Sequence, residues 1–218
     1  GRLKMYFICF ESKNMRELIN KISVGLGEKK AELVLKGGQI FNLITGEISL
    51  GDIAITDGMI VGTYDEYDGE KIIDLNGGFV VPGFIDSHLH IESSMLTPLE
   101  FDRCVTPKGI TTAICDPHEI ANVIGSEGVK YFQRASACTM MDIKVQIPSC
   151  VPSTSMETSG AQLTAKDIKL LMKHESSLGL AEMMNYPGVI ERDPEVLAKL
   201  NLYGGSHIDG HVPLVGGR

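Results

Sequence analysis

The sequence lacks several features that mark particular classes of protein. Its five cysteines are odd in number and never spaced as CxxC, which argues against a disulfide framework and against a cysteine zinc site. It contains no uninterrupted apolar run long enough to span a membrane, and YFICF near the N-terminus is too short for the core of a signal peptide. The 20 Lys and Arg residues form no block, and the formal net charge is −8. We therefore expect a reducing, cytoplasmic location, no membrane span and no nucleic-acid partner.

The composition is that of a globular protein. Of the 218 residues, 43% are hydrophobic and 22% are charged, which is enough to form a sizeable core. Met15 opens the segment MRELINKI as a translation start would, so residues 1–14 are expected to be upstream sequence. Residues 1–30 are expected to form an N-terminal segment.

Residues 31–82 alternate short apolar runs with turn signals. The Asp57-Gly58 pair between two apolar runs predicts a β-hairpin, and Gly37-Gly38 and Gly77-Gly78 predict further turns. This part of the chain is therefore predicted to be a small all-β unit.

Residues 83–218 alternate strand-like and helix-like segments. Strands are predicted at 84–90, 110–116, 142–148, 178–184 and 206–211, and helices at 96–106, 126–138, 164–174 and 193–201. Thr164 and Asp167 resemble a capping box, and Asp193-Pro194 supplies an N-cap followed by proline at the first helical position. The alternation indicates βα units around a parallel sheet.

Two α/β architectures share this pattern, a doubly wound sheet and a (β/α)₈ barrel. The only glycines of the GxG type near the start, Gly25 and Gly27, lack the third glycine of GxGxxG, and the first strand of the alternating region ends in histidines. These features favour the barrel. A complete barrel needs about 250 residues, so about five strands indicate a partial one.

The stretch FIDSHLHIESS carries two histidines at strand spacing. On a strand, Asp86, His88 and His90 line one face, and Ile85, Leu89 and Ile91 line the other. The apolar set is expected to pack under the helices and the polar set to point into the barrel mouth, where two imidazoles can bind one cation. The alternative is the polar face of a surface strand.

Glu182 lies in the predicted strand 178–184, on the same face as Leu178, Leu180 and Met184. Burying an unpaired carboxylate costs several kcal/mol, and a bound cation would offset that cost. There are two alternatives to a bound cation: Glu182 forms a salt bridge with an Arg or Lys, or it lies at a strand end that is already in water.

Two further groups of polar residues lie at the ends of predicted strands, and His174 lies at the end of the predicted helix 164–174. His211 and Asp209 share one face at the end of the fifth strand, whereas His207 is expected to lie too deep to share a site with His211. Pro117 is expected to end the second strand, so that Asp116, His118 and Glu119 project from a loop. His118-Glu119 does not open HExxH, because Asn122 occupies the fifth position, and the HxE and PCxxC signature of zinc nucleobase deaminases is absent. His174 is expected to be solvated or to interact with a helix end.

Several motifs together resemble the N-terminal part of the adenine deaminases of the amidohydrolase superfamily. They are PGFIDSHLHIESSMLTP, DPHEIANVIG, IPSCVPST, METSGA, GLAEMMNYPGVI and IDGHVPLVGG. The PGxxDxHxH pattern is typical of the whole superfamily, whereas HIESSM, DPHEIANV and AEMMNYPGV in this order are more specific. The resemblance implies a metal-dependent (β/α)₈ barrel beside a small β-sandwich, of which residues 31–82 would be one part.

The resemblance also implies a function and a set of site residues. His88 and His90 would bind one metal, Glu182 would bridge two metals, and His211 would bind the second. Asp116, His118 and Glu119 would contact the substrate or support the ligands. The implied cofactor is a pair of Mn²⁺ or Fe²⁺ ions, and a His and carboxylate set without thiolate also suits Zn²⁺.

The implied reaction is the hydrolytic deamination of adenine to hypoxanthine and ammonia in purine salvage. A further histidine and the aspartate that shuttles the proton are expected beyond Arg218, so the 218 residues alone are expected to be inactive, and the full-length protein to be a homo-oligomer. The alternatives are an amidohydrolase that acts on a cyclic amide and a non-catalytic metal-binding fragment.

Overall fold

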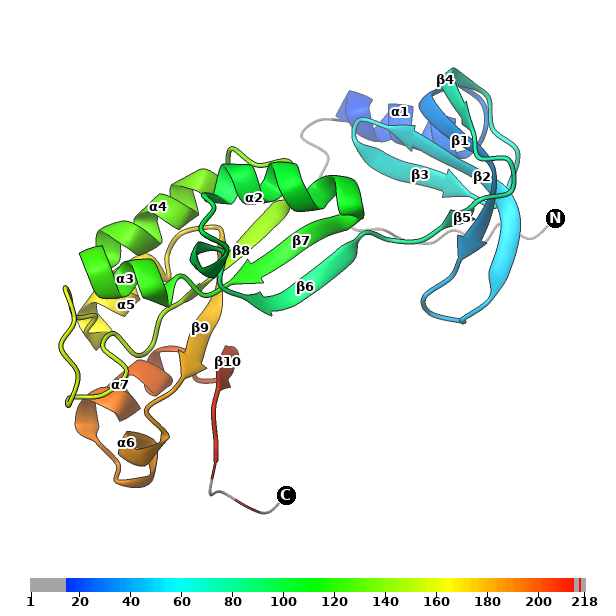
Figure 1. Cartoon of the computed structure of the whole chain (residues 1–218). Helices are drawn as coiled ribbons and strands as arrows, with labels where there is room; N and C mark the ends of the chain where they lie inside the picture. The colour runs from blue at the N-terminus through cyan, green and yellow to red at the C-terminus, as the bar shows by residue number, and fades with distance from the viewer. Residues whose placement is uncertain (1–14, 214–215, 217–218) are drawn as a thin grey trace. The chain divides into compact units, whose positions relative to one another are not determined.

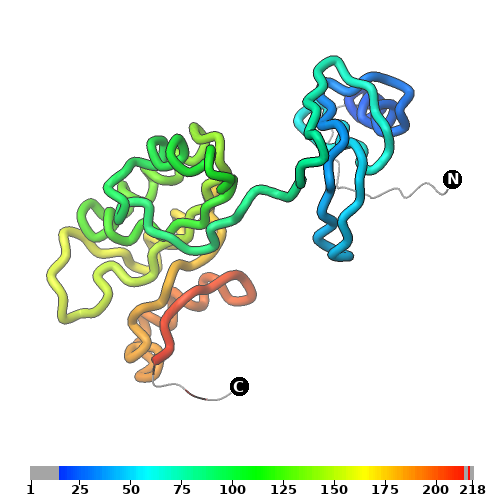
Figure 2. The backbone as a smooth tube through the Cα atoms, turned by 45° about the vertical axis from the view of Figure 1, so that its right-hand side comes forward, coloured from blue at the N-terminus to red at the C-terminus, as the bar shows by residue number. Residues whose placement is uncertain are grey.

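The computed structural model describes residues 15–213 and residue 216, and the chain divides into two compact units (Figure 1, Figure 2). The first unit ends at Pro82, and the second begins at Gly83. The prediction that residues 1–14 are upstream sequence concerns residues outside this described part.

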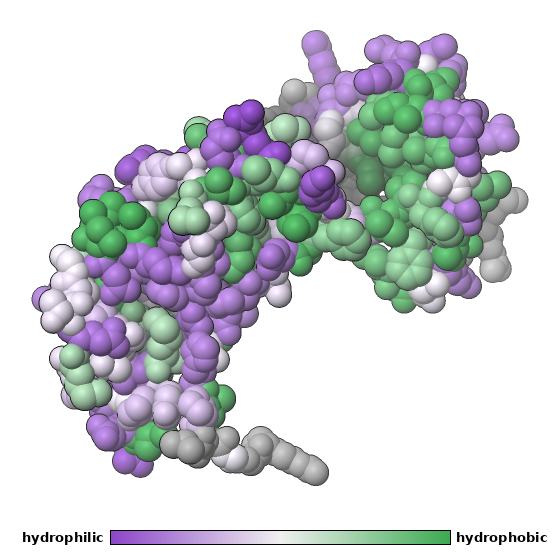
Figure 3. Space-filling model, viewed as in Figure 1, coloured by the Kyte–Doolittle hydropathy of each residue, from purple (hydrophilic) through white to green (hydrophobic). Residues whose placement is uncertain are grey.

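The first unit is a helix on a five-stranded sheet. Its elements are α1 (Met15–Gly25), β1 (Ala31–Phe41), β2 (Ile48–Thr56), β3 (Met59–Thr63), β4 (Gly69–Asp74) and β5 (Phe79–Val80). Strand β1 pairs antiparallel with β2 and parallel with β4 and β5, and β3 pairs with β2. Large apolar side chains of this unit are exposed, including Ile44, Leu50 and Phe79, and Figure 3 shows broad hydrophobic surface on it.

Two of the three predicted glycine turns are confirmed in this unit. Asp57 and Gly58 join β2 to β3 with φ angles of 50° and 68°, the left-handed pair that a two-residue hairpin needs. Gly77 turns the chain between β4 and β5. The turn predicted at Gly37-Gly38 is wrong, because both residues lie inside β1. There the pairing with β2 shifts register and Gly37 has a φ of 64°, so the glycines accommodate a bulge in a continuous strand.

The second unit is built on a parallel five-stranded sheet. Its strands are β6 (Phe84–Leu89), β7 (Ile110–Cys115), β8 (Asp142–Ile147), β9 (Ser177–Met183) and β10 (His207–Gly210). The spatial order is β10-β9-β8-β7-β6, so each strand pairs with its neighbours in the chain, and every pair is parallel. This order confirms the partial (β/α) barrel.

Helices follow the strands in the predicted places. They are α2 (Pro98–Val105), α4 (Ser126–Ser136), α5 (Ala165–Leu171) and α7 (Pro194–Leu202). The capping box of Thr164 and Asp167 is confirmed, and so is the N-cap at Asp193, whose carboxylate accepts the N–H groups of Glu195 and Val196. Further short elements were not predicted: α3 (His118–Ile124), α6 (Tyr186–Ile190), and the 3₁₀ turns η1 (Glu92–Ser94) and η2 (Thr106–Lys108).

The core of this unit lies between the sheet and its helices. Ile143, Val145 and Ile147 of β8 are almost fully buried there, together with Phe132 of α4 and Ile168 of α5. Each such side chain contributes about 1.5–3 kcal/mol on burial. The core fixes which face of each strand is left for polar residues.

One apolar residue of the first barrel strand does not pack as predicted. Ile91 is buried and Leu89 packs against the core, but the side chain of Ile85 is 64% exposed. Strand β6 is an edge strand of the described sheet, and Ile85, near its start, is not among the residues that pack against the core.

Among the described residues, no helix combines the length and the apolar character that a membrane crossing requires.

Candidate metal centre

Histidines and carboxylates gather at the C-terminal ends of the strands in the second unit, which is the end of a (β/α) barrel that carries its chemistry. His88 lies on β6, Glu182 lies on β9, and His90 and Asp116 directly follow β6 and β7. The backbone N–H of Asp116 donates to the carbonyl of Leu89 at 3.0 Å, which continues the ladder between β6 and β7. This bond holds the first residue after β7 beside His90.

The carboxylate of Glu182 is the centre of the group. It is only 8% exposed. Its Oε1 lies 3.3 Å from His90 Nε2, 3.7 Å from His118 Nδ1 and 3.9 Å from His88 Nε2. Its Oε2 lies 2.5 Å from His211 Nε2. Within the described residues its ion-pair partners are all histidines, so the salt bridge with Arg or Lys that the sequence left open is not formed there.

Four of these residues lie close enough to share one ion. His90, Asp116, His118 and Glu182 each offer a ligand atom, and these atoms lie within 4.8 Å of one another. Two ligand atoms about 2.1 Å from a tetrahedral metal are about 3.4 Å apart, close to the 3.3 Å between His90 and Glu182. The spacing and the mix of imidazole and carboxylate therefore fit a divalent transition metal.

Asp116 provides a second indication that the group fits a cation. Its side chain is 1% exposed, and its Oδ2 accepts a hydrogen bond from His118 Nδ1 at 3.0 Å. Its Oδ1 is buried and has no hydrogen-bond partner among the described residues. An unpaired carboxylate oxygen is costly in the interior of a protein, and a cation would satisfy it.

The ring of His90 is oriented for ligation by the backbone. Its Nδ1 lies 2.8 Å from the carbonyl oxygen of Asp116, which can only accept, so Nδ1 carries the proton. The lone pair is then on Nε2, the atom that faces Glu182. Partners of this kind set the tautomer of metal-binding histidines.

The electrostatics of His118 follow from its acidic neighbours. Burial opposes the charged imidazole, but the hydrogen bond and charge of Asp116, with Glu119 and Glu182, outweigh burial and raise the pKa of His118 to about 9. Burial raises the pKa of Asp116, and His118 and His90 offset part of this effect. The group thus favours a positive charge at its centre.

Glu92 and Ser93 contact the start of α3 next to the four-residue group and were not predicted. Ser93 donates to Glu119 Oε1 at 2.6 Å, and Glu92 Oε1 accepts the N–H of Ile120 at 3.3 Å. Burial and the neighbouring Glu119 raise the pKa of Glu92 to about 7. Burial opposes ionisation of Glu119, but hydrogen bonds from Ser93 and Glu92 outweigh it and lower the pKa of Glu119. Both residues lie within the HIESSM motif, and this motif is the sequence signal that could have identified them.

The surroundings of His118 and Glu119 differ from the prediction. Both were expected in a loop after Pro117, but they form the first turn of α3, which begins at His118 directly after the proline. Glu119 is favourable there because carboxylates stabilise the positive end of a helix. The helix fixes the backbone of His118, and Glu119 Oε2 comes within 3.6 Å of His90 Nδ1.

The remaining histidines lie at different distances from the centre. His88 and His211 contact Glu182 but are not part of the four-residue group. His207 pairs with Gly179 at the start of β10, below the level of Glu182, as expected. His174 hydrogen-bonds with Ser176 at 2.9 Å.

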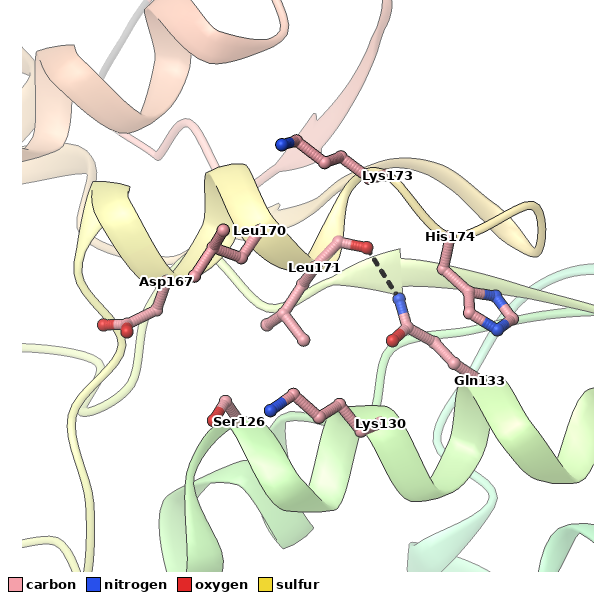
Figure 4. Close-up of a pocket in the computed structure, with 8 residues that line it drawn as sticks. All are labelled: Ser126, Lys130, Gln133, Asp167, Leu170, Leu171, Lys173 and His174. Atoms are coloured by element: carbon pink, nitrogen blue, oxygen red, sulfur yellow. Dashed lines mark hydrogen bonds between the residues drawn. The ribbon is translucent and has the colours of Figure 1, made fainter.

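His174 also lines a hollow of about 380 Å³ between α4 and α5, on the helix side of the sheet (Figure 4). Two of the polar side chains around this hollow have structural roles: Gln133 donates to the carbonyl of Leu171, and Asp167 completes the capping box. The candidate site is therefore the group at the strand ends.

A partial (β/α) barrel with histidines and carboxylates at its strand ends defines a class of metal-dependent hydrolases. The chain belongs to the amidohydrolase family, a metal-dependent family whose model matches residues 79–213.

Comparison with known proteins confirms the resemblance to adenine deaminases. The chain is 58% identical over 203 residues to the adenine deaminase of Cereibacter sphaeroides and 57% identical over 196 residues to that of Brucella anthropi. These matches cover 93% and 90% of this chain, but the chain spans only 36% and 35% of the two relatives.

The crystal structure of N-acyl-D-glutamate deacylase from Bordetella bronchiseptica has the same fold. It matches with a TM-score of 0.54 and 17% sequence identity over 81% of this chain and 44% of that one.

Proposed function

We propose that this chain is part of an adenine deaminase that converts adenine and water into hypoxanthine and ammonia. In this reaction the bond between C6 and the exocyclic nitrogen breaks, a bond from C6 to oxygen forms, and the leaving amine takes up a proton. The identity to proteins named adenine deaminase supports the substrate. The observation that carries the proposal is the buried carboxylate of Glu182, surrounded by histidines at the strand ends.

We assign the ligands as follows. Glu182 would be shared by two cations, His88 and His90 would hold one of them, and His211 would hold the other. The contacts of Glu182 with all three histidines support this assignment. Asp116 and His118 lie within ligand distance of the same carboxylate and are additional candidates. Glu119 Oε2 lies 3.6 Å from His90 Nδ1, and Glu119 Oε1 accepts a hydrogen bond from the hydroxyl of Ser93.

The proposed metals are Mn²⁺ or Fe²⁺, with Zn²⁺ as the third candidate, because the donors are imidazoles and carboxylates. A divalent cation supplies the activation of water at neutral pH. The protein orients the imidazoles that would hold the cation. Asp116 fixes the ring of His90 through its carbonyl, and its own carboxylate binds His118.

The free thiols among the described residues, Cys104, Cys115, Cys138 and Cys150, support a reducing, cytoplasmic location for this enzyme. Its place in purine salvage and its assembly as a homo-oligomer remain parts of the proposal.

The test is ammonia release from adenine by the protein at the full length of its relatives, supplied with Mn²⁺, Fe²⁺ or Zn²⁺ in turn. Adenosine and a cyclic amide such as a dihydropyrimidine serve as competing substrates. We expect adenine to be turned over and the Glu182→Gln variant to be inactive. Hydrolysis of the cyclic amide without deamination of adenine would overturn the assignment of the substrate.

A further inference from the structure

The first and last strands of the described barrel sheet are joined by a side-chain contact. His88 lies on β6 and Asp209 on β10, the two edges of the sheet. In a flat sheet, strands four positions apart are about 19 Å from each other. Nevertheless, Nδ1 of His88 lies 2.9 Å from Oδ2 of Asp209. The sheet is therefore curved enough for both side chains to reach the same place at its mouth.

The carboxylate of Asp209 is oriented for this contact. Its Oδ1 accepts the backbone N–H of Gly210 at 2.8 Å, which leaves Oδ2 to face the imidazole. An ionised carboxylate can only accept hydrogen bonds, so Nδ1 of His88 carries the proton. The lone pair of His88 is then on Nε2, the atom 3.9 Å from Glu182 Oε1.

The two histidines of the HxH pair thus have the same tautomer but different partners. For His90 the acceptor is the backbone carbonyl of Asp116, which no substitution removes. For His88 the acceptor is a side chain from the far edge of the sheet. This difference makes the orientation of His88 separately testable.

We propose that Asp209 is the positioning residue of His88: it holds the proton on Nδ1 and directs Nε2 toward the cation beside Glu182. The inference rests on the proposed function, because it takes His88 as a metal ligand. Loss of such a partner typically lowers metal affinity by about 10–100-fold. Asp209 on β10 would then set the orientation of His88, a metal ligand on β6.

The test uses Asp209→Asn, Asp209→Ala and Asp209→Glu in the full-length protein. Affinity is measured by titration with Co²⁺, followed through its visible absorption, and the tautomer of His88 is read from ¹⁵N NMR of the metal-free protein. We expect the Asn and Ala variants to bind Co²⁺ about 10–100-fold more weakly, and Asn to shift the proton of His88 toward Nε2. We expect Glu to restore most of the affinity.

Two controls separate the possible failures. Asp142→Asn removes the same charge from an exposed position at the N-terminal end of β8 and should change neither readout. His88→Ala should weaken Co²⁺ binding. If His88→Ala weakens binding but Asp209→Asn changes neither affinity nor tautomer, the inference is overturned and the proposed function stands. If His88→Ala itself has no effect, His88 is not a ligand, and the assignment of the metal site fails first.

Discussion

His90 Nε2 faces Glu182 Oε1 at 3.3 Å, although two strands, β7 and β8, separate β6 from β9. In a flat sheet, strands three positions apart would be about 14 Å from each other. Curvature of the sheet and the inward direction of both side chains together close this distance. The contact is thus a consequence of the barrel, and it places a nitrogen donor and an oxygen donor at the separation that one metal ion requires.

Glu182→Gln should abolish specific metal binding. The substitution keeps the shape of the side chain but removes the charge that all four histidines face. A metal at a hundredfold excess over its Kd stabilises the folded state by about 2.7 kcal/mol, and we expect this stabilisation in the wild type only. Thermal unfolding with and without Mn²⁺ measures it. Glu127→Gln, at an exposed position on α4, is the control, and metal-dependent stabilisation of Glu182→Gln would contradict the prediction.

His118→Ala should lower metal affinity, because His118 belongs to the four-residue group and lies beside both Asp116 and Glu182. The matched control is His174→Ala, which removes an imidazole that bonds to Ser176 on the helix side of the sheet. Isothermal titration with Zn²⁺ distinguishes the two variants. Removing a ligand should cost more than the roughly 10–100-fold loss typical of a supporting residue. Equal affinities for both variants would show that His118 is not a ligand.

The sequence predicted the barrel because its signals are local. Alternation of apolar runs, the cap at Thr164 and the proline at Pro194 each act within a few residues, and each is observed. Helix α3 was missed because it has only seven residues and directly follows Pro117, which was interpreted as the start of a loop. At Gly37 the local turn signal was misleading, because pairing of β1 with its neighbours on both sides of the bulge keeps the strand continuous.

The site was harder to predict than the fold. The HxH spacing indicates that His88 and His90 share a face. Glu182 shares a strand face with apolar residues, which indicates that its carboxylate is buried and needs a partner. Neither pattern shows how strongly the sheet curves, and curvature decides which side chains meet. The contact between His88 and Asp209 crosses the whole described sheet, and no local pattern connects residues on opposite edges.

Gly125→Ala should destabilise the protein by about 1–3 kcal/mol. Gly125 joins α3 to α4 with a φ of 65° and a ψ of −141°, a conformation that is essentially restricted to glycine. An added Cβ would also lie 3.1 Å from the Cβ of Ala161. The control is Gly204→Ala, where the nearest atom to the new Cβ is 3.6 Å away and φ is not positive. Urea unfolding of both variants measures the difference, and equal stabilities would show that the strain is absent.

Asp102→Asn should destabilise the protein in a pH-dependent way. Asp102 is buried on α2, and its carboxylate accepts the N–H groups of Met140 and Met141 at 2.9 and 3.0 Å and the hydroxyl of Thr106 at 2.6 Å. Burial opposes its ionisation, but these hydrogen bonds outweigh burial and hold the pKa of Asp102 below its ordinary value. Loss of hydrogen bonds to the charged group should cost about 1–3 kcal/mol at pH 6.

The sign of the pH effect follows from the direction of that shift. Because the folded pKa is below the unfolded one, the stabilisation by Asp102 is fully present above the unfolded pKa of about 4 and is lost as the pH falls through the folded pKa. The difference in unfolding free energy between wild type and Asp102→Asn should therefore be constant from pH 7 to about 5 and narrow below about 4. Urea titrations across this range measure it, with Asp142→Asn as the exposed control. A difference that stays unchanged at low pH would mean that the charge of Asp102 is not what stabilises the link between α2 and the segment before β8.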